Sequence, residues 1–182
     1  MALNFFQRGW LMSASRMHIS IARCACGSVV LETTGPPILS AACYCDDCQE
    51  GARQIEALPN AQPVPGPDGG TEYLLFRKDR VKCSKGAGQL RDYRIRSGSP
   101  TRRVVAACCN SAMFLEVRKG HWLSVYRARF EADALPVQMR IQTKFRPEER
   151  EIPRDVPSYP KVPFTLIAKL LAARVAMALH RS

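Results

Sequence analysis

The sequence lacks several features that would assign it to a common functional class. It has no uncharged apolar run of about eighteen residues, which excludes a conventional membrane-spanning helix. It has only three histidines, and it shows no Ser/His/Asp arrangement, phosphate-binding glycine loop or dinucleotide-binding fingerprint. The apolar run Trp10-Leu11-Met12 is too short for the core of a secretory signal, and no basic start precedes it. We therefore expect a cytoplasmic protein that is neither secreted nor a common nucleotide-binding enzyme.

Acidic residues are also scarce. The chain carries 27 Lys and Arg against 16 Asp and Glu, a formal charge of +11. At 46% hydrophobic and 24% charged residues, its composition is that of a globular domain and excludes general disorder or a coiled coil. Most of the excess charge lies between Arg77 and Arg103. In a strand predicted over Leu90–Arg96, Arg94 and Arg96 would share one face. That face could bind nucleic-acid phosphates, steer an anionic thiol, or simply be solvated.

The pattern of short apolar runs and turn residues predicts a mostly β fold without βαβ units. Asp46–Leu58 is the exception: it has helical composition and precedes a loop over Pro59–Gly70. The expected strands are His18–Arg23, Val29–Thr33, Ile38–Ala42, Tyr73–Arg77, Arg80–Cys83, Leu90–Arg96, Arg103–Cys108, Met113–Val117 and Leu123–Phe130.

Both ends of the chain differ from this β-rich region. Residues 1–16 are interpreted as an extension, with Met17 as the functional start or, alternatively, with a weak likeness to an organelle transit peptide. Residues 146–163 are rich in proline and charge, which predicts a linker. Phe164–His180 then predicts a helix with a broad apolar face. Such a helix docks on its own domain or a partner subunit, or lies on a membrane surface as a basic amphipathic helix.

Cysteine is the informative residue. Seven of the eight cysteines form three tight groups, and Cys83 stands alone as an expected buried strand residue. Cysteines one or two residues apart form strained disulfides, if any, so metal binding fits this spacing better. Thiolates from two distant turns are how tetrahedral zinc sites are assembled, and zinc is therefore the expected cofactor. The groups are Cys24-x-Cys26-Gly27, Cys43-x-Cys45-x-x-Cys48 and Cys108-Cys109.

These motifs carry a resemblance. The segments CACG and CYCDDC, followed late in the chain by CCNSAMF, resemble the family of glutathione-dependent formaldehyde-activating enzyme (GFA) and centromere protein V. The details CYCDDCQ, Gly69-Gly70-Thr71 and Ala107-Cys108-Cys109 are similar to a divergent bacterial branch of unassigned function. The resemblance implies an Mss4-like zinc-binding β fold with one short early helix, here in residues 17–145. Residues 164–182 would add the C-terminal amphipathic helix.

The resemblance also implies the ligands of two zinc ions. Cys24, Cys26 and Cys109 match a structural zinc site of the family. Ala106 stands where the family has the fourth cysteine, and Asn110 replaces a glycine, so Cys108 is the candidate for the missing thiolate. The central run Cys43, Cys45 and Cys48 matches a second zinc site, which in the family is associated with glutathione and its formaldehyde adduct.

Three ligands in one short run can leave a fourth metal position open, as a catalytic zinc requires. The resemblance therefore implies a carbon–sulfur lyase that uses glutathione or a similar small thiol and acts on a small aldehyde adduct. Asp46 and Asp47 are expected to be helix N-terminal acids rather than catalytic bases. The alternative is a non-catalytic, zinc-stabilised module that binds nucleic acid or a protein partner, since every cysteine group could also be purely structural.

Overall fold

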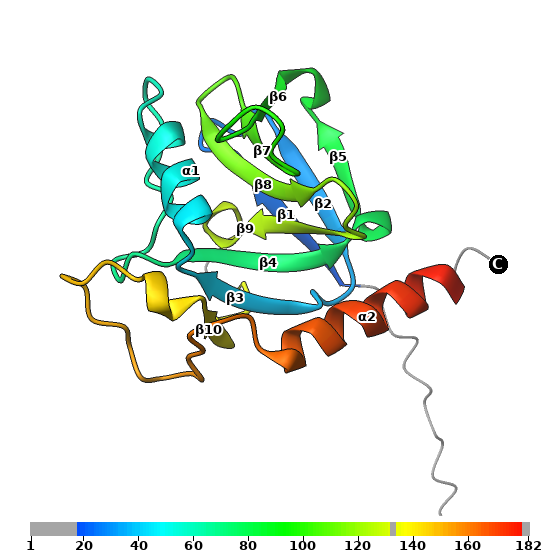
Figure 1. Cartoon of the computed structure of the whole chain (residues 1–182). Helices are drawn as coiled ribbons and strands as arrows, with labels where there is room; N and C mark the ends of the chain where they lie inside the picture. Colours follow the sequence, from blue (N-terminus) through cyan, green and yellow to red (C-terminus); the bar gives the residue numbers. More distant parts are fainter. Residues whose placement is uncertain (1–17, 132–133, 180–182) are drawn as a thin grey trace, which may run out of the picture.

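Two β-sheets and two α-helices make up the fold in a computed structural model that describes residues 18–131 and 134–179. The predicted extension (1–16), Met17 and His180 lie outside these residues. The smaller sheet has the strand order β1-β2-β5, and the larger one has the order β10-β3-β4-β9-β8-β7-β6. Figure 1 shows helices α1 and α2 beside the larger sheet, so the expected mostly β class with an early and a C-terminal helix is confirmed.

The strands and helices of the described residues have the following bounds. The first half contains β1 (Ile19–Arg23), β2 (Val30–Thr34), β3 (Leu39–Cys43), α1 (Asp46–Glu56), β4 (Thr71–Arg77) and β5 (Val81–Lys85). The second half contains β6 (Leu90–Tyr93), β7 (Thr101–Ala106), β8 (Ser111–Val117), β9 (Trp122–Tyr126), β10 (Met139–Ile141) and α2 (Phe164–Leu179). All neighbouring strands are antiparallel except β3 and β10, which pair in parallel.

The larger sheet is buried on both faces, and strand β4 shows why. Its alternate side chains point to opposite faces, as in any strand. Leu74 and Phe76 join the core shared with the smaller sheet. Tyr73 and Leu75 join the core beneath α1 and α2, together with the buried Leu166 of α2. The molecule therefore has three layers, and each cysteine motif lies on one side of the middle layer or the other.

Helix α1 places Cys48 of the central cysteine motif in the core. Its buried residues, Cys48, Gly51, Ala52 and Ile55, recur at helical spacing, while the exposed acids Asp46 and Asp47 lie in its first turn. Acids at this position interact favourably with the helix dipole. The expected helix and the expected role of these two acids are consistent with this arrangement.

One strand within the basic stretch is shorter than predicted. The strand predicted over Leu90–Arg96 ends at Tyr93, so the shared strand face of Arg94 and Arg96 is wrong. The chain turns here because Gly98 adopts a positive φ of 77°. Arg94 donates to the carbonyl of Ser99 at 2.6 Å instead of pointing from a strand.

The segment predicted as a linker returns to the domain. The backbone of Arg140 in β10 bonds to Pro157 at 2.9 Å and to Tyr159 at 2.8 Å. Its guanidinium pairs with Asp155 at 2.6 Å. Strand β10 has only three residues, and the sequence pattern does not predict it. The segment that contains Pro157 and Tyr159 lies beside β10 and leads into α2.

Candidate metal centre

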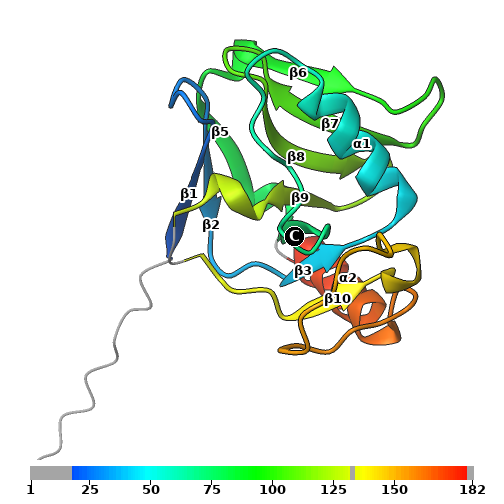
Figure 2. The same ribbon diagram turned by 90° about the vertical axis from the view of Figure 1, so that its left-hand side faces the viewer.

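Four of the predicted ligands come together between two turns. Cys24 and Cys26 lie in the turn from β1 to β2, and Cys108 and Cys109 lie in the turn from β7 to β8. The four sulfur atoms all lie within 4.8 Å of one another, although the two pairs are about eighty residues apart in the chain. Figure 2 gives a second view of these strands, turned from that of Figure 1.

The sulfur separations match those of a tetrahedral thiolate site. Cys26 Sγ lies 3.3 Å from Cys108 Sγ and 3.6 Å from Cys24 Sγ. Cys108 Sγ is also 3.8 Å from Cys24 Sγ and 3.9 Å from Cys109 Sγ. Four sulfurs at a zinc–sulfur distance of about 2.3 Å form a tetrahedron with edges of roughly 3.8 Å. This cluster therefore has the ligand type and spacing of a closed four-coordinate zinc site.

Hydrogen bonds fix both turns around the sulfurs. The backbone N–H of Val29 donates to Cys24 Sγ at 3.2 Å. The Ser111 hydroxyl accepts from the backbone of Ala25 at 3.0 Å and lies 3.1 Å from Cys109 Sγ, so it connects the two turns. Hydrogen bonds from the side chain and then the backbone of Ser28 lower the pKa of Cys26 to about 6.

The two departures from the family pattern keep this geometry. Ala106, at the position of the absent family cysteine, is fully buried in the core. Cys108, two residues later, lies in the cluster instead, because the turn brings its sulfur close to those of the other three cysteines. Asn110, in place of a glycine, has a φ of 51°, and asparagine tolerates this left-handed conformation. The four-cysteine cluster is thus complete despite both changes.

The other three predicted ligands form a second cluster on the opposite side of the larger sheet. Cys43 ends β3, Cys45 is the residue before α1, and Cys48 lies in the first turn of that helix. Their sulfurs all lie within 4.8 Å of one another, with Cys43 and Cys45 at 3.5 Å. Among the described His, Cys, Asp and Glu residues, no fourth joins this group. The hydroxyl of Tyr73 lies 3.6 Å from Cys48 Sγ.

Tyr44 anchors the middle of this motif. Its side chain is fully buried, and its hydroxyl donates to Asp68 at 2.6 Å. Gln49 donates to the Tyr44 carbonyl at 2.7 Å and to the Phe145 carbonyl at 2.6 Å, so the motif is tied to the loop before α2. The Tyr44 ring packs so closely on Gly70 that a Cβ there would lie 2.7 Å from the ring.

We expect Gly70→Ala to destabilise the protein by about 1–3 kcal/mol, because the added methyl overpacks a buried ring. This cost corresponds to a fall in Tm of roughly 2–12 °C for a chain of this size. Gly88→Ala is the matched control, since a Cβ at Gly88 meets nothing within 4 Å. Thermal unfolding followed by circular dichroism tests the pair, and equal Tm values would contradict the packing argument.

A buried arginine lies beside the three-cysteine cluster. Arg103 of β7 is 2% exposed and donates to the backbone carbonyl of Asp47, while its Nε and one terminal nitrogen have no partner. Hydrogen bonds with Cys43 and Cys48 lower the pKa of Cys45 to about 3, and the charge of Arg103 acts in the same direction. An unpaired buried cation is costly unless an anion lies nearby. Thiolates that bind a metal ion supply that negative charge. The position of Arg103 therefore fits a cluster whose three cysteines bind a metal ion as thiolates.

The four-cysteine cluster has a comparable neighbour. Arg129 also has a buried Nε without a partner. Burial lowers the pKa of Arg129, and the neighbouring Cys109 and Cys24 oppose that change. Both clusters therefore combine an all-thiol ligand set with a nearby arginine, which is the arrangement expected for negatively charged metal–thiolate centres.

The remaining sequence candidates lie elsewhere. Cys83 is in β5 as predicted, but it is half-buried rather than buried. His121 Nε2 lies 2.7 Å from the Leu170 carbonyl and helps to dock α2. Much of the basic stretch is engaged internally. Arg103 is buried, and four further cations form ion pairs: Arg77–Asp79, Lys78–Glu116, Arg96–Asp47 and Arg102 with Asp92 and Glu116.

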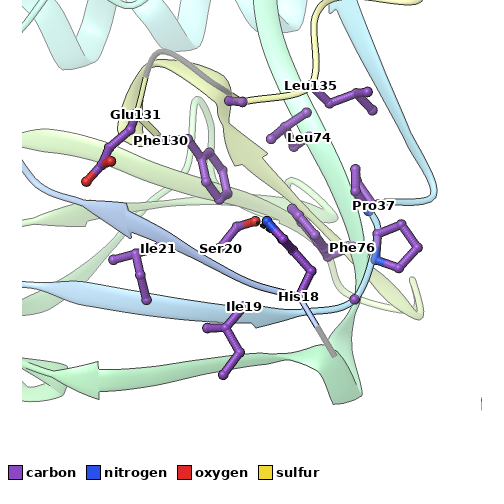
Figure 3. Close-up of a pocket in the computed structure, with 13 residues that line it drawn as sticks. His18, Ile19, Ser20, Ile21, Pro37, Leu74, Phe76, Phe130, Glu131 and Leu135 are labelled. Atoms are coloured by element: carbon purple, nitrogen blue, oxygen red, sulfur yellow. Dashed lines mark hydrogen bonds between the residues drawn. The ribbon is translucent and has the colours of Figure 1, made fainter. Parts of the chain in front are cut away.

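A hollow of about 440 Å³ lies apart from both clusters, and Figure 3 shows the residues that line it. Its wall is mainly apolar and includes Ile21, Phe76 and Phe130. His18 is one of the lining residues, and Figure 3 shows its ring beside the Ser20 hydroxyl, which lies 3.1 Å from Nδ1. Its lining contains neither a clustered cysteine nor a residue next to one in the sequence, so this hollow lies apart from both clusters.

Three comparisons with known proteins bear on these clusters. The sequence model of the family described as "Glutathione-dependent formaldehyde-activating enzyme" matches residues 19–58, which include five of the seven clustered cysteines. A search of curated proteins found no match. Among solved structures, a Rhodobacter sphaeroides protein from structural genomics is similar at 17% identity and a TM-score of 0.45, covering 76% of this chain and 98% of its own.

The matched segment contains the CACG motif, the CYCDDC motif and the whole of α1, in the order found by sequence. The late cysteine pair that completes the first cluster lies outside it. Over residues 19–58 the chain is therefore similar to this family, and the two cysteine clusters are compatible with that similarity.

Proposed function

We propose that this chain is a two-zinc protein in which the three-cysteine cluster activates a small thiol, such as glutathione, for addition to a small aldehyde. Cys24, Cys26, Cys108 and Cys109 would hold a structural zinc. Cys43, Cys45 and Cys48 would hold the second. The observation that carries the proposal is the difference between the clusters: one has four protein sulfurs, and the other has three with no fourth described side chain of a ligand type.

This difference matters because structural zinc sites are closed, whereas catalytic ones keep a position for a substrate. Zinc at the three-cysteine cluster would supply a Lewis acid that lowers the pKa of a substrate thiol. The reaction class is reversible addition: a carbon–sulfur bond forms, the carbonyl π-bond breaks, and the thiol proton passes to the oxygen. The reverse direction makes the protein a carbon–sulfur lyase.

The protein's own residues would bind and orient the thiol. A hollow of about 560 Å³ runs along the outer side of α1. No cysteine lines it, but it adjoins the three-cysteine cluster through Asp46, the residue after Cys45. Arg53 and Arg150 also line it, beside acids such as Glu50. Glutathione carries two carboxylates and one ammonium group, so a hollow with cations and acids matches both signs of its charge. The charge of Arg103 would favour a thiolate over a thiol at the cluster.

Cys45→Ser is the decisive variant, because Cys45 is the least buried of the three ligands. We expect wild-type protein to hold two zinc ions and to accelerate exchange between formaldehyde and its glutathione adduct, measured by NMR exchange spectroscopy. Cys45→Ser should hold one zinc, keep its circular dichroism spectrum and lose the acceleration by at least about a hundredfold. Cys83→Ser is the matched control and should behave like wild type.

Each contrary outcome has a definite meaning. Well under one zinc per chain would remove the zinc proposal altogether. Two zinc ions without acceleration of the exchange would remove the enzyme and favour a zinc-stabilised binding module. Unfolding of Cys45→Ser would assign the second zinc a structural role.

A further inference from the structure

Helix α2 exposes a continuous apolar stripe. Phe164, Ile167, Leu171, Val175 and Leu179 follow one another at intervals of three or four residues, so they lie along one face of the helix. All five are exposed, and Phe164 reaches 81% and Leu179 73%. Only two other large apolar residues in the described chain, Ile19 and Val162, are exposed. The stripe therefore holds five of the seven exposed large apolar residues of the described chain.

The docking of α2 fixes the direction in which this stripe faces. Leu166 is buried in the core beneath the larger sheet, and the partly buried Leu170 packs against that core. The ring of His121, the residue before β9, contacts the Leu170 carbonyl. In Figure 1, α2 lies along the lower edge of the molecule with no helix or strand drawn below it. Because Leu166 and Leu170 occupy the inner face, the stripe must face outward.

The segment that carries the stripe has charge of one sign. From Val156 to Leu179 the chain contains three cations and no acid. Lys169 and Arg174 lie on the helix on either side of the apolar stripe, and Lys161 precedes it. The whole chain carries a formal charge of +11. An apolar face bordered only by cations is complementary to a surface that is apolar within and anionic outside.

A second copy of the chain is a poorer occupant. A helix of 16 residues is about 24 Å long, so a stripe about 10 Å wide offers roughly 240 Å². A stable dimer buries about 800 Å² on each partner. Pairing two copies through α2 would also bring their cations together without any acid from the same segment to neutralise them.

We propose that α2 docks this protein on the surface of membranes that contain anionic lipid. The stripe would enter the boundary between headgroups and acyl chains, and Lys169 and Arg174 would contact the anionic headgroups. The protein body, on which the inner face of α2 is docked, takes the place of the polar face that such a helix usually turns to water. None of the described helices has the length and apolar character needed to cross a membrane.

Vesicle flotation with the full chain tests the proposal. We expect wild-type protein to bind phosphatidylcholine vesicles containing about 30% phosphatidylglycerol, and to bind pure phosphatidylcholine vesicles at least about tenfold more weakly. Raising NaCl to about 0.5 M should weaken binding, because salt screens the attraction between exposed charges. Leu171→Glu/Val175→Glu should abolish binding without unfolding the domain, since both side chains are exposed.

A charge-matched pair of variants separates the contribution of α2 from that of net charge. Lys169→Glu/Arg174→Glu should reduce binding roughly 10–30-fold. Lys82→Glu/Arg91→Glu makes the same change in exposed residues of β5 and β6, away from α2 in Figure 1, and should reduce it much less. Equal losses in both pairs, or no flotation of wild type, would overturn the proposal. So would a dimer in analytical ultracentrifugation that Leu171→Glu/Val175→Glu dissociates, because the stripe would then be a self-interface.

Discussion

Cys24→Ser is expected to lose one zinc ion and to lower the Tm by roughly 10–20 °C. Its sulfur is 3% exposed, lies 3.6 Å from Cys26 Sγ and 3.8 Å from Cys108 Sγ, and accepts a backbone hydrogen bond from Val29. Structural zinc in small domains contributes about 10–16 kcal/mol of apparent binding free energy to folding. This domain also has a large apolar core, so a loss of several kcal/mol, rather than complete unfolding, is the expected result.

Differential scanning calorimetry with zinc analysis of the same sample measures both effects. The control is Cys83→Ser, which removes a half-buried thiol that belongs to neither cluster and should change the Tm by at most a few degrees. Cys108→Ser gives an independent check, because this cysteine is exposed and has little packing to lose. A Cys108→Ser protein with unchanged Tm and zinc content would show that the fourth thiolate is not Cys108.

The cysteine motifs could be predicted from the sequence because metal-ligand spacing is a local property. Residues one to three apart on a turn are close in any fold, so Cys43, Cys45 and Cys48 needed no tertiary information. Predicting which distant cysteines join Cys24 and Cys26 requires tertiary information. Cys108 joins the first cluster through the pairing of β7 with β8, and that position was reached from the family pattern rather than from periodicity.

Arg103 shows what the sequence could not provide. In the sequence it is one cation of the basic stretch between Arg77 and Arg103, yet in the structure it shares strand parity with the buried Val105 and faces α1. Its burial depends on Gly51 of that helix, where an added Cβ would lie 1.9 Å from Arg103 Nε. The burial of Arg103 follows only from the packing of β7 against α1. Arg94 and Arg96 differ from the prediction for a local reason, because the strand ends at Tyr93 and the chain turns at Gly98.

We expect Arg103→Met to weaken zinc binding at the three-cysteine cluster by about 10–100-fold and to leave the four-cysteine cluster unchanged. Three thiolates with one zinc carry a net charge of −1, and Arg103 is the buried cation beside them. Methionine has a similar length but no charge, so the thiolates would lose their counter-charge in a site with little water. Competition with a chromophoric chelator measures the two zinc affinities separately. Arg102→Met is the control, because Arg102 is partly exposed and its loss removes only surface ion pairs.

A double-mutant cycle with Cys45→Ser distinguishes charge compensation from simple packing. Without zinc at the three-cysteine cluster, Arg103 is a buried cation whose Nε and one terminal nitrogen lack partners, and replacing it with an apolar side chain should be neutral or stabilising. With zinc bound, the same replacement should destabilise the protein, because the anionic centre is left uncompensated. The sign of the effect on Tm should therefore reverse between the two backgrounds. An equal loss of Tm in both would mean that Arg103 stabilises the contact between β7 and α1 and contributes nothing to the charge of the metal centre.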